Sequence, residues 1–377
     1  MMTGYGALYL HVPFCRSKCA YCDFDSRVPS SCSASEELDA YFSHLHAALR
    51  RHGEAGELSD VRTVYLGGGT PTFAGDRILE TASLVRRYCT PNEFTCEANP
   101  DTFSCEMASA LAERGVTRVS LGVQTLEPSE LRAIGRIHTA DQALDAIEAA
   151  HQAGFSVSCD LMCGLPGQTA ASWRSTLSRI IDAAPHHVSV YPLQLEEGTA
   201  LYRSVEEGRV SIPDEDFQAT CMTEAERLLS CAGYERYEVA SYALPGHACR
   251  HNIAYWTGVG YLGLGRSAAS MHDTATGRIR RVQTDDAGSI FETEELTARE
   301  AAAEDLMLAC RMTRGISPEL LDSAARSIPA PALKAACERA VELGLASWHG
   351  GSLAPTRLGW LDGNALFGLF WDLAQGD

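Results

Sequence analysis

Three cysteines near the start of the chain have a spacing that could hold a metal. They form the pattern Cys15-x3-Cys19-x2-Cys22, and an apolar run at residues 7–14 leads directly into it. Three thiolates can hold three irons of a cubane cluster and leave the fourth iron open to an exchangeable ligand. The alternatives are three unconnected thiols, or a zinc site completed by a histidine; structural zinc sites usually present paired C-x2-C knuckles, and the sequence has no second pair. The spacing therefore favours a [4Fe-4S] cluster.

A glycine-rich turn follows the next apolar run, which covers residues 61–66. Its sequence is Gly67-Gly68-Gly69-Thr70-Pro71. Glycines there let the backbone approach a ligand closely, and the proline sets the exit from the turn. The turn lacks the Lys-Ser/Thr of a phosphate loop and the spacing of a dinucleotide fingerprint, so both are excluded. An ordinary tight turn between a strand and a helix is the alternative to a ligand site.

Polar residues also end three later apolar runs. Glu97, Gln124 and Asp160 occupy these positions, and Arg136 lies in the connection after the fourth run. Two acids and an amide can hold ribose hydroxyls and an ammonium group, while a guanidinium can clamp a carboxylate through two hydrogen bonds. The alternative is that these side chains cap helices or pair with one another.

These positions depend on an alternation of strands and helices. We expect strands at 7–14, 61–66, 94–98, 118–123, 156–162 and 187–193, with helices at 36–52, 76–88, 104–114, 139–153, 169–184 and 216–230. Such alternation predicts an α/β fold with a parallel sheet and helices outside it. Six units fit an open, partial (β/α)6 barrel, and a doubly wound sheet is the alternative. In both folds the carboxyl ends of the strands face the ligand.

The alternation ends near residue 234, so we expect three parts. Residues 1–234 form the barrel, and residues 235–296 form a Gly- and aromatic-rich connecting region without a clear period. Residues 297–377 form a smaller C-terminal helical module whose order of three helices and a hairpin is winged-helix-like. Residues 301–377 carry 6 Lys+Arg and 9 Asp+Glu, and this excess of negative charge argues against DNA binding by the module.

Composition limits the partners and the compartment. The 377 residues are 45% hydrophobic and carry a formal net charge of −18. This charge argues against nucleic acid as a partner. No window reaches the ~18–20 apolar residues of a transmembrane segment, and residues 1–14 lack the basic region of a signal peptide. We therefore expect a cytoplasmic protein.

The residues around the cysteines resemble the radical S-adenosylmethionine (SAM) superfamily, including an aromatic residue before the third cysteine; the stretch reads Tyr9-Leu-His11-Val-Pro13-Phe14-Cys15-Arg-Ser-Lys-Cys19-Ala-Tyr21-Cys22. The resemblance implies that Cys15, Cys19 and Cys22 hold the cluster and that its open iron binds the amino and carboxylate groups of SAM. Within the coproporphyrinogen III oxidase-like branch, it implies SAM contacts at Tyr9, Gly68, Gly69, Thr70, Glu97, Gln124, Arg136 and Asp160.

The chain resembles two groups of that branch. The oxygen-independent coproporphyrinogen III oxidases carry a fourth cysteine two residues after the third, where this chain has Phe24. A Phe there is similar to the HemW-type haem chaperones, as is the run His251-Asn252-Ile-Ala-Tyr255-Trp256, which matches their H-N-x-x-Y-W motif. A neutral imidazole is a common axial ligand, and aromatic rings can pack on a flat macrocycle. A histidine satisfied within an aromatic turn is the alternative.

The resemblance to the chaperones implies haem as cargo at His251 and acceptor haemoproteins as partners. The alternative is the oxidase reaction, a radical oxidative decarboxylation of coproporphyrinogen III, so the sequence leaves enzyme activity open. We expect the segment Gly258–Gly265 to line a lateral opening of the barrel beside the planar ligand, so that a bulky residue at Gly263 or Gly265 weakens haem binding and spares the cluster. A homodimer is open on family grounds, and no apolar stripe demands one.

Overall fold

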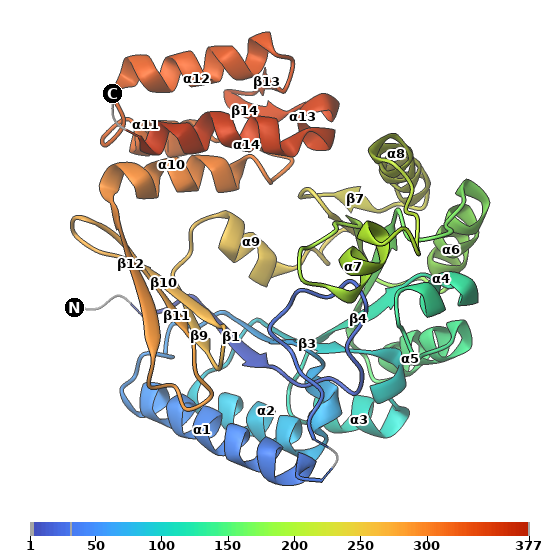
Figure 1. Cartoon of the computed structure of the whole chain (residues 1–377). Helices are drawn as coiled ribbons and strands as arrows, with labels where there is room; N and C mark the ends of the chain where they lie inside the picture. Colours follow the sequence, from blue (N-terminus) through green and yellow to red (C-terminus); the bar gives the residue numbers. More distant parts are fainter. Residues whose placement is uncertain (1–3, 31, 376–377) are drawn as a thin grey trace.

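Six parallel strands lie side by side in chain order in the computed structural model, which describes residues 4–30 and 32–375 (Figure 1). They are β1 (Ala7–Val12), β2 (Thr63–Gly68), β3 (Glu93–Ala98), β4 (Arg118–Gln124), β5 (Ser156–Cys163) and β6 (His187–Pro192). A doubly wound sheet reverses its strand order at a switch point, and the order of these six strands does not reverse. The prediction of an α/β fold with a partial barrel is confirmed.

Helices connect these strands and cover the outer face of the sheet (Figure 1). They are α1 (Ala34–Glu54), α2 (Asp76–Tyr88), α3 (Cys105–Glu113), α4 (Pro128–Ala133), α5 (Ala140–Gln152) and α6 (Ala170–Asp182), with α7 (Ala200–Glu206) and α8 (Glu215–Cys231) after the sixth strand. The sequence did not predict α4 and α7, because helices of six or seven residues are too short to show a helical period.

The strands turn apolar side chains outward and polar ones inward. Leu8 and Leu66 are fully buried in the core between sheet and helices. The alternate positions of the same strands carry residues such as Tyr9, Tyr65 and Glu97. Because successive side chains of a strand point to opposite faces, these polar and aromatic residues line the inner face of the barrel. That face is the one available to a ligand.

The connecting region extends the sheet, although its sequence showed no clear period. On one side, β9 (Tyr261–Leu264) pairs in parallel with β1, and β10 (Ala269–Asp273), β11 (Gly277–Gln283) and β12 (Phe291–Thr297) continue it antiparallel. On the other, β8 (Ser241–Ala243) and β7 (Glu235–Arg236) follow β6. Only Leu296 of β12 is buried, so an alternating pattern cannot form there. The division of the chain at residues 234 and 296 stays a prediction. Residues 1–3 of the first predicted part and residues 376–377 of the last lie outside the described residues.

Gly263 and Gly265 of the glycine-rich segment do not border an opening. A Cβ at Gly263 would lie 2.1 Å from the carbonyl oxygen of Ala269, and a Cβ at Gly265 would meet the backbone oxygen of His11 at 2.7 Å. Both glycines are buried against their own protein, because β9 is sandwiched between β1 and β10. The expectation that they line a ligand site is wrong: a bulky residue there would disturb the sheet beside the cysteine loop.

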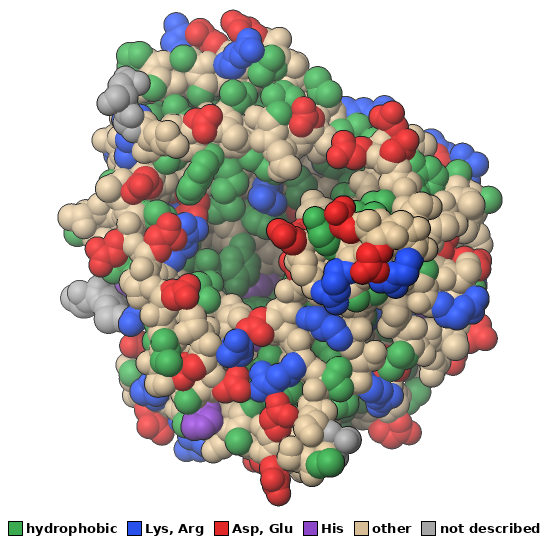
Figure 2. Space-filling view, viewed as in Figure 1, with side chains coloured by type: hydrophobic (Ala, Val, Ile, Leu, Met, Phe, Trp, Pro, Cys, Tyr) green, Lys and Arg blue, Asp and Glu red, His purple; other side chains and the backbone are tan. Residues whose placement is uncertain are grey.

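The C-terminal module follows β12 directly. It consists of α10 (Ala298–Ala309), α11 (Pro318–Ala324), α12 (Ala330–Glu342), the hairpin β13 (Ala346–His349) and β14 (Ser352–Pro355), α13 (Arg357–Leu361) and α14 (Gly363–Trp371). The module has its own apolar core and lies above the barrel, with α9 (Arg250–Trp256) between them (Figure 1). Figure 2 shows a hollow between the two parts in which hydrophobic side chains gather.

Across the described residues, no helix combines the length and the apolar character needed to span a membrane.

Candidate functional site

The three predicted cluster cysteines lie on one loop that follows β1. Cys15 is buried, while Cys19 and Cys22 are half-buried. The hydroxyl of Thr70, from the glycine-rich turn, donates to the Cys15 sulfur at 3.6 Å. The two motifs, about 50 residues apart in the sequence, therefore meet because β1 and β2 are neighbours.

Charged residues of the connecting region anchor the cysteine loop. The Asp25 carboxylate accepts from the Arg266 guanidinium at 2.6 Å and also from the Ser267 hydroxyl. Arg27 pairs with Asp286 at 2.7 Å. These contacts join the loop to segments beyond residue 260, so the connecting region helps to position the cysteines.

The cysteine arrangement can be compared with a single-ion site. Among the described residues, no three His, Cys, Asp or Glu side chains converge closely enough to hold one metal ion. A zinc ion draws its sulfur ligands to ~2.3 Å from one centre, whereas a cubane binds each cysteine to a different iron. A cubane therefore does not require the three sulfurs to converge on one ion.

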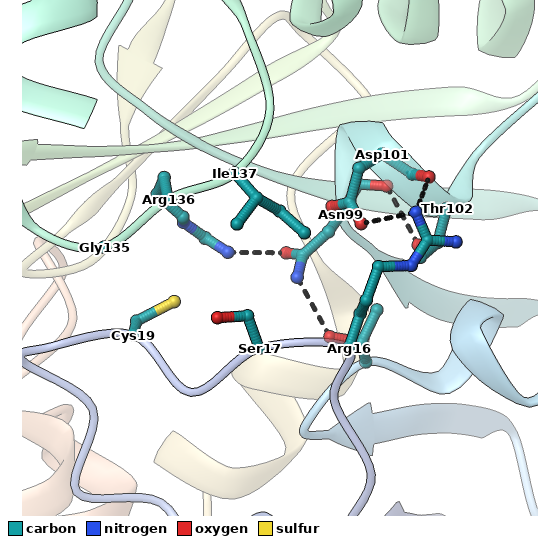
Figure 3. Close-up of a pocket in the computed structure, with 10 residues that line it drawn as sticks. Arg16, Ser17, Cys19, Asn99, Asp101, Thr102, Gly135, Arg136 and Ile137 are labelled. Atoms are coloured by element: carbon teal, nitrogen blue, oxygen red, sulfur yellow. Dashed lines mark hydrogen bonds and ion pairs between the residues drawn. The ribbon is translucent and has the colours of Figure 1, made fainter. Parts of the chain in front are cut away.

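A polar pocket adjoins the loop, and a hydrogen-bonded chain crosses it (Figure 3). The Arg136 guanidinium donates to Asn99 Oδ1 at 2.8 Å, and Asn99 Nδ2 donates to Thr70 Oγ1 at 2.9 Å. Cys19 lies on the same pocket wall. The Nε of Arg136 is buried without a hydrogen-bond partner, so the pocket retains a free donor for an acceptor such as a carboxylate.

Two glycines leave room that a side chain would fill. A Cβ at Gly69 would lie 2.7 Å from the carbonyl oxygen of Phe14 and 2.8 Å from the Cys15 sulfur. A Cβ at Gly122, on the inner face of β4, would lie 2.6 Å from the Arg136 guanidinium. Gly68 has a φ of 120°, which L side chains rarely adopt. The glycines thus keep a cradle open between the cysteines and Arg136.

Glu97 lies at the centre of the inner face. Its carboxylate accepts from the Tyr65 hydroxyl at 2.8 Å and from the Gly68 amide at 3.1 Å. Burial raises the pKa of Glu97 to about 7, and the nearby charge of Asp160 acts in the same direction while both hydrogen bonds oppose it. The carboxyl therefore titrates near neutrality and is poised to change charge when a ligand arrives.

The remaining predicted cofactor residues lie around Glu97. Asp160 accepts from the Ser120 hydroxyl at 3.0 Å, and burial raises its pKa. Gln124 has a φ of 66° at a register shift of β4, a strained conformation that turns its side chain toward Gly122. The Tyr9 hydroxyl contacts His11 Nδ1 at 3.0 Å. The structure thus gathers all eight predicted SAM residues on the inner face and its rim.

His251 lies on the same inner face, at the opposite ends of the strands. Its ring stacks on Tyr65, with centroids 5.1 Å apart, and its Nδ1 contacts the Thr63 hydroxyl at 3.0 Å. Glu93 accepts from the His251 amide at 2.9 Å and thereby holds the start of α9. Burial lowers the pKa of His251 to about 3, so the imidazole is neutral.

The free nitrogen of His251 bears directly on metal binding. Its Nε2 is buried and has no hydrogen-bond partner. A neutral imidazole whose Nδ1 is held by a neighbour is the form that binds a metal through Nε2. The ring is only 1% exposed, so an iron can reach Nε2 only when α9 or the groups beside it move.

Comparison with known proteins places the chain in a family. The family model of the radical SAM superfamily matches residues 9–180, which include most of β1, the cysteine loop and β2–β5. The haem chaperone HemW of Bacillus subtilis is 31% identical over 376 residues, which cover 96% of this chain and 98% of that relative. The chain belongs to the HemW family of radical SAM proteins. The resemblance inferred from the cysteine loop and the H-N-x-x-Y-W motif is confirmed.

Further comparisons agree with membership of the HemW family. The haem chaperone HemW of Mycobacterium tuberculosis is 33% identical over 95% of this chain and 93% of that relative. Coproporphyrinogen III oxidase (HemN) from Escherichia coli, a radical SAM enzyme, has a TM-score of 0.80 over 97% of this chain and 90% of its own, at 20% identity. That likeness shows a shared fold for the HemW-family chain and carries no reaction over to it.

Three residues of this HemW-family site were absent from the predicted set. Asn99 links Arg136 to Thr70, Tyr65 lies between Glu97 and His251, and Thr63 holds the His251 ring. The signal for Tyr65 and Thr63 was present as the alternation along β2, since both share the inward face with Gly67. Asn99 stands two residues after Glu97, so the same alternation of side chains pointed to it.

Proposed function

We propose that the chain is a haem chaperone of the HemW type, which binds haem together with a SAM-ligated [4Fe-4S] cluster and passes the haem to acceptor haemoproteins. The observation that carries the proposal is the similarity to HemW proteins along nearly the whole chain, including the connecting region and the C-terminal module. The neutral His251 imidazole with its unpartnered Nε2 supports haem as the cargo, because haem iron takes such a ligand.

The proposed cofactor site consists of the residues described above. Cys15, Cys19 and Cys22 would hold the cluster. The Arg136 guanidinium would bind the SAM carboxylate, and the cradle at Gly68, Gly69 and Thr70 would receive its amino group; the groups for the rest of the cofactor would be Tyr9, Glu97, Gln124 and Asp160. The cluster and SAM supply one-electron chemistry when bound, and the chain supplies position and charge.

The Glu97 carboxyl predicts a pH dependence of SAM binding. An ionised carboxylate accepts hydrogen bonds from SAM more strongly than a protonated one, and Glu97, with a pKa of about 7, is mostly ionised only above that pH. SAM affinity should therefore fall as the pH drops through 7, by up to tenfold per unit well below that value. Glu97→Gln should remove most of this dependence and weaken binding at pH 8 by roughly tenfold.

Equilibrium binding of SAM to the cluster-loaded protein, measured from pH 6 to 8.5, checks this prediction. Glu113→Gln, which changes an exposed carboxylate at the end of α3, is the matched control and should keep the wild-type profile. An unchanged profile in Glu97→Gln would show that another group governs the titration.

The oxidase reaction gives the proposal its enzymatic test. Anaerobic protein with a reduced cluster is incubated with SAM and coproporphyrinogen III, and the products are separated by chromatography. We expect no vinyl products, because Phe24 replaces the fourth cysteine of the oxidases and its side chain is 63% exposed on the cysteine loop. SAM cleavage coupled to vinyl-group formation would overturn the chaperone proposal.

A further inference from the structure

Arg311 lies between the helix that carries His251 and the C-terminal module. It stands in the turn after α10, and its guanidinium carbon is 5.0 Å from the ring centre of Trp256 on α9 and 4.8 Å from that of Phe367 on α14. Aromatic faces stabilise a cation. A guanidinium also carries five N–H donors, and those donors need acceptors.

Two buried donors at this point have no acceptor. In the described part of the chain, Arg311 Nε and Trp256 Nε1 are buried and make no hydrogen bond. Glu238 acts on Arg311 through its charge, but the carboxylate of Glu238 is itself hydrogen-bonded to Ser241 and to the backbone. Burial lowers the pKa of Arg311, the direction expected for a cation that no anion contacts.

Other buried arginines show what Arg311 lacks. Arg278 pairs at 2.8 Å with each of three carboxylates, Asp273, Glu304 and Asp305. Within residues 4–30 and 32–375, the second arginine with a buried and unpartnered Nε is Arg136, the residue proposed to bind the SAM carboxylate. The Arg136 guanidinium keeps one hydrogen bond, to Asn99 Oδ1, whereas its unpartnered Nε is the donor that we propose to face a carboxylate from outside the chain.

We propose that Arg311, with Trp256 Nε1 beside it, binds a carboxylate of the cargo, namely a propionate of haem. This assignment rests on the proposed function, since the cargo supplies the carboxylate. α9 carries His251 near its start and Trp256 at its end, about 7.5 Å apart along the helix axis at 1.5 Å per residue. One short helix thus connects the proposed haem ligand His251, which stacks on Tyr65 of the barrel, with Trp256, which lies beside Arg311 and the C-terminal module.

The surroundings suit the rest of the cargo. The hollow between barrel and module, which Figure 2 shows with hydrophobic side chains gathered in it, offers an apolar environment to a flat ring. A charged propionate would be costly to place there without a cation. A guanidinium offers the paired donors that match a carboxylate, and a neighbouring indole N–H adds a third donor.

The test compares haemin with haem dimethyl ester, whose propionates carry no charge, in Soret titrations of the cluster-loaded protein. Arg311→Gln should bind haemin roughly 10- to 100-fold more weakly than the wild type. The wild type should lose a similar factor on the ester, and Arg311→Gln should bind both ligands equally, because the anchor is gone. Arg311→Lys keeps the positive charge but lacks the paired N–H donors of the guanidinium, so it should bind haemin with intermediate affinity.

Arg314→Gln, three residues further on and exposed, is the matched control and should bind like the wild type. Thermal melting and cluster absorbance establish that each variant is folded, and the ester titration of the wild type tests the anchor even if Arg311→Gln fails to fold. If the wild type bound haemin and its ester with equal affinity, or if a folded Arg311→Gln bound haemin like the wild type, the proposed role of Arg311 would be overturned. The chaperone proposal would not be affected by either result. A wild type that binds neither ligand would overturn the chaperone proposal itself.

Discussion

Replacing Cys19 by alanine is expected to abolish the iron–sulfur cluster. Three thiolates hold three irons of a cubane, and two leave a second iron without its protein ligand. Reconstituted wild type should contain about four irons per chain, and Cys19→Ala should contain close to none. Loss of the open iron should also remove SAM binding, although Arg136 and Glu97 remain in place. Metal analysis by mass spectrometry and the visible absorbance of the cluster measure both effects.

Cys231→Ala is the control for this experiment. Cys231 is an exposed free cysteine at the end of α8, so its loss should change neither iron content nor SAM affinity. Zinc in place of iron in the anaerobically purified wild type would contradict the cluster assignment. Full iron content in Cys19→Ala would contradict the assignment of this residue.

Replacing His251 by alanine is expected to reduce haem affinity more than any other single change on α9. Loss of a partner that only orients a metal-binding histidine typically costs 10–100-fold, and loss of the ligand itself should cost at least as much. Thr63→Val, which removes the hydroxyl at 3.0 Å from Nδ1 and keeps the ring, should weaken haem binding within that range. The wild-type Soret band should change in position as well as in strength when the axial ligand is lost.

His44→Ala is the matched control, since His44 is exposed on α1. Iron content should stay at the wild-type value in His251→Ala, because the ring stacks on Tyr65 of β2 and not on the cysteine loop. Unaltered haem binding in a folded His251→Ala would show that the ring is a buried structural residue stacked on Tyr65 rather than a ligand.

The sequence allowed the barrel and much of the candidate site to be predicted, because these depend on local patterns. The cysteine spacing, the glycine turn and the polar strand ends each lie within a few residues of one strand, and parallel strands bring their ends together. Regular alternation with helices predicted the six strands but left a doubly wound order open, and the structure shows the strands in chain order. Phe24 and the H-N-x-x-Y-W motif were equally local signals.

Contacts between distant segments could not be predicted in this way. Thr63 and His251 are 188 residues apart, and no local pattern pairs them. The strands β9–β12 extend the sheet beyond β1, but β12 is exposed on both faces and so lacks an alternating pattern. The error at Gly263 has the same origin, since its close neighbour Ala269 becomes visible only when β9 and β10 pack together. Arg311 was overlooked because its aromatic partners come from two other helices.

An anaerobic titration of the cluster-loaded wild type with haemin, followed at the Soret band, tests the chaperone proposal most directly. We predict saturable binding of one haem per chain, with the cluster absorbance retained throughout. Gel filtration of the mixture should then leave haem on the protein. A Soret change that grows without saturation, as non-specific adsorption of haemin gives, would contradict the central claim.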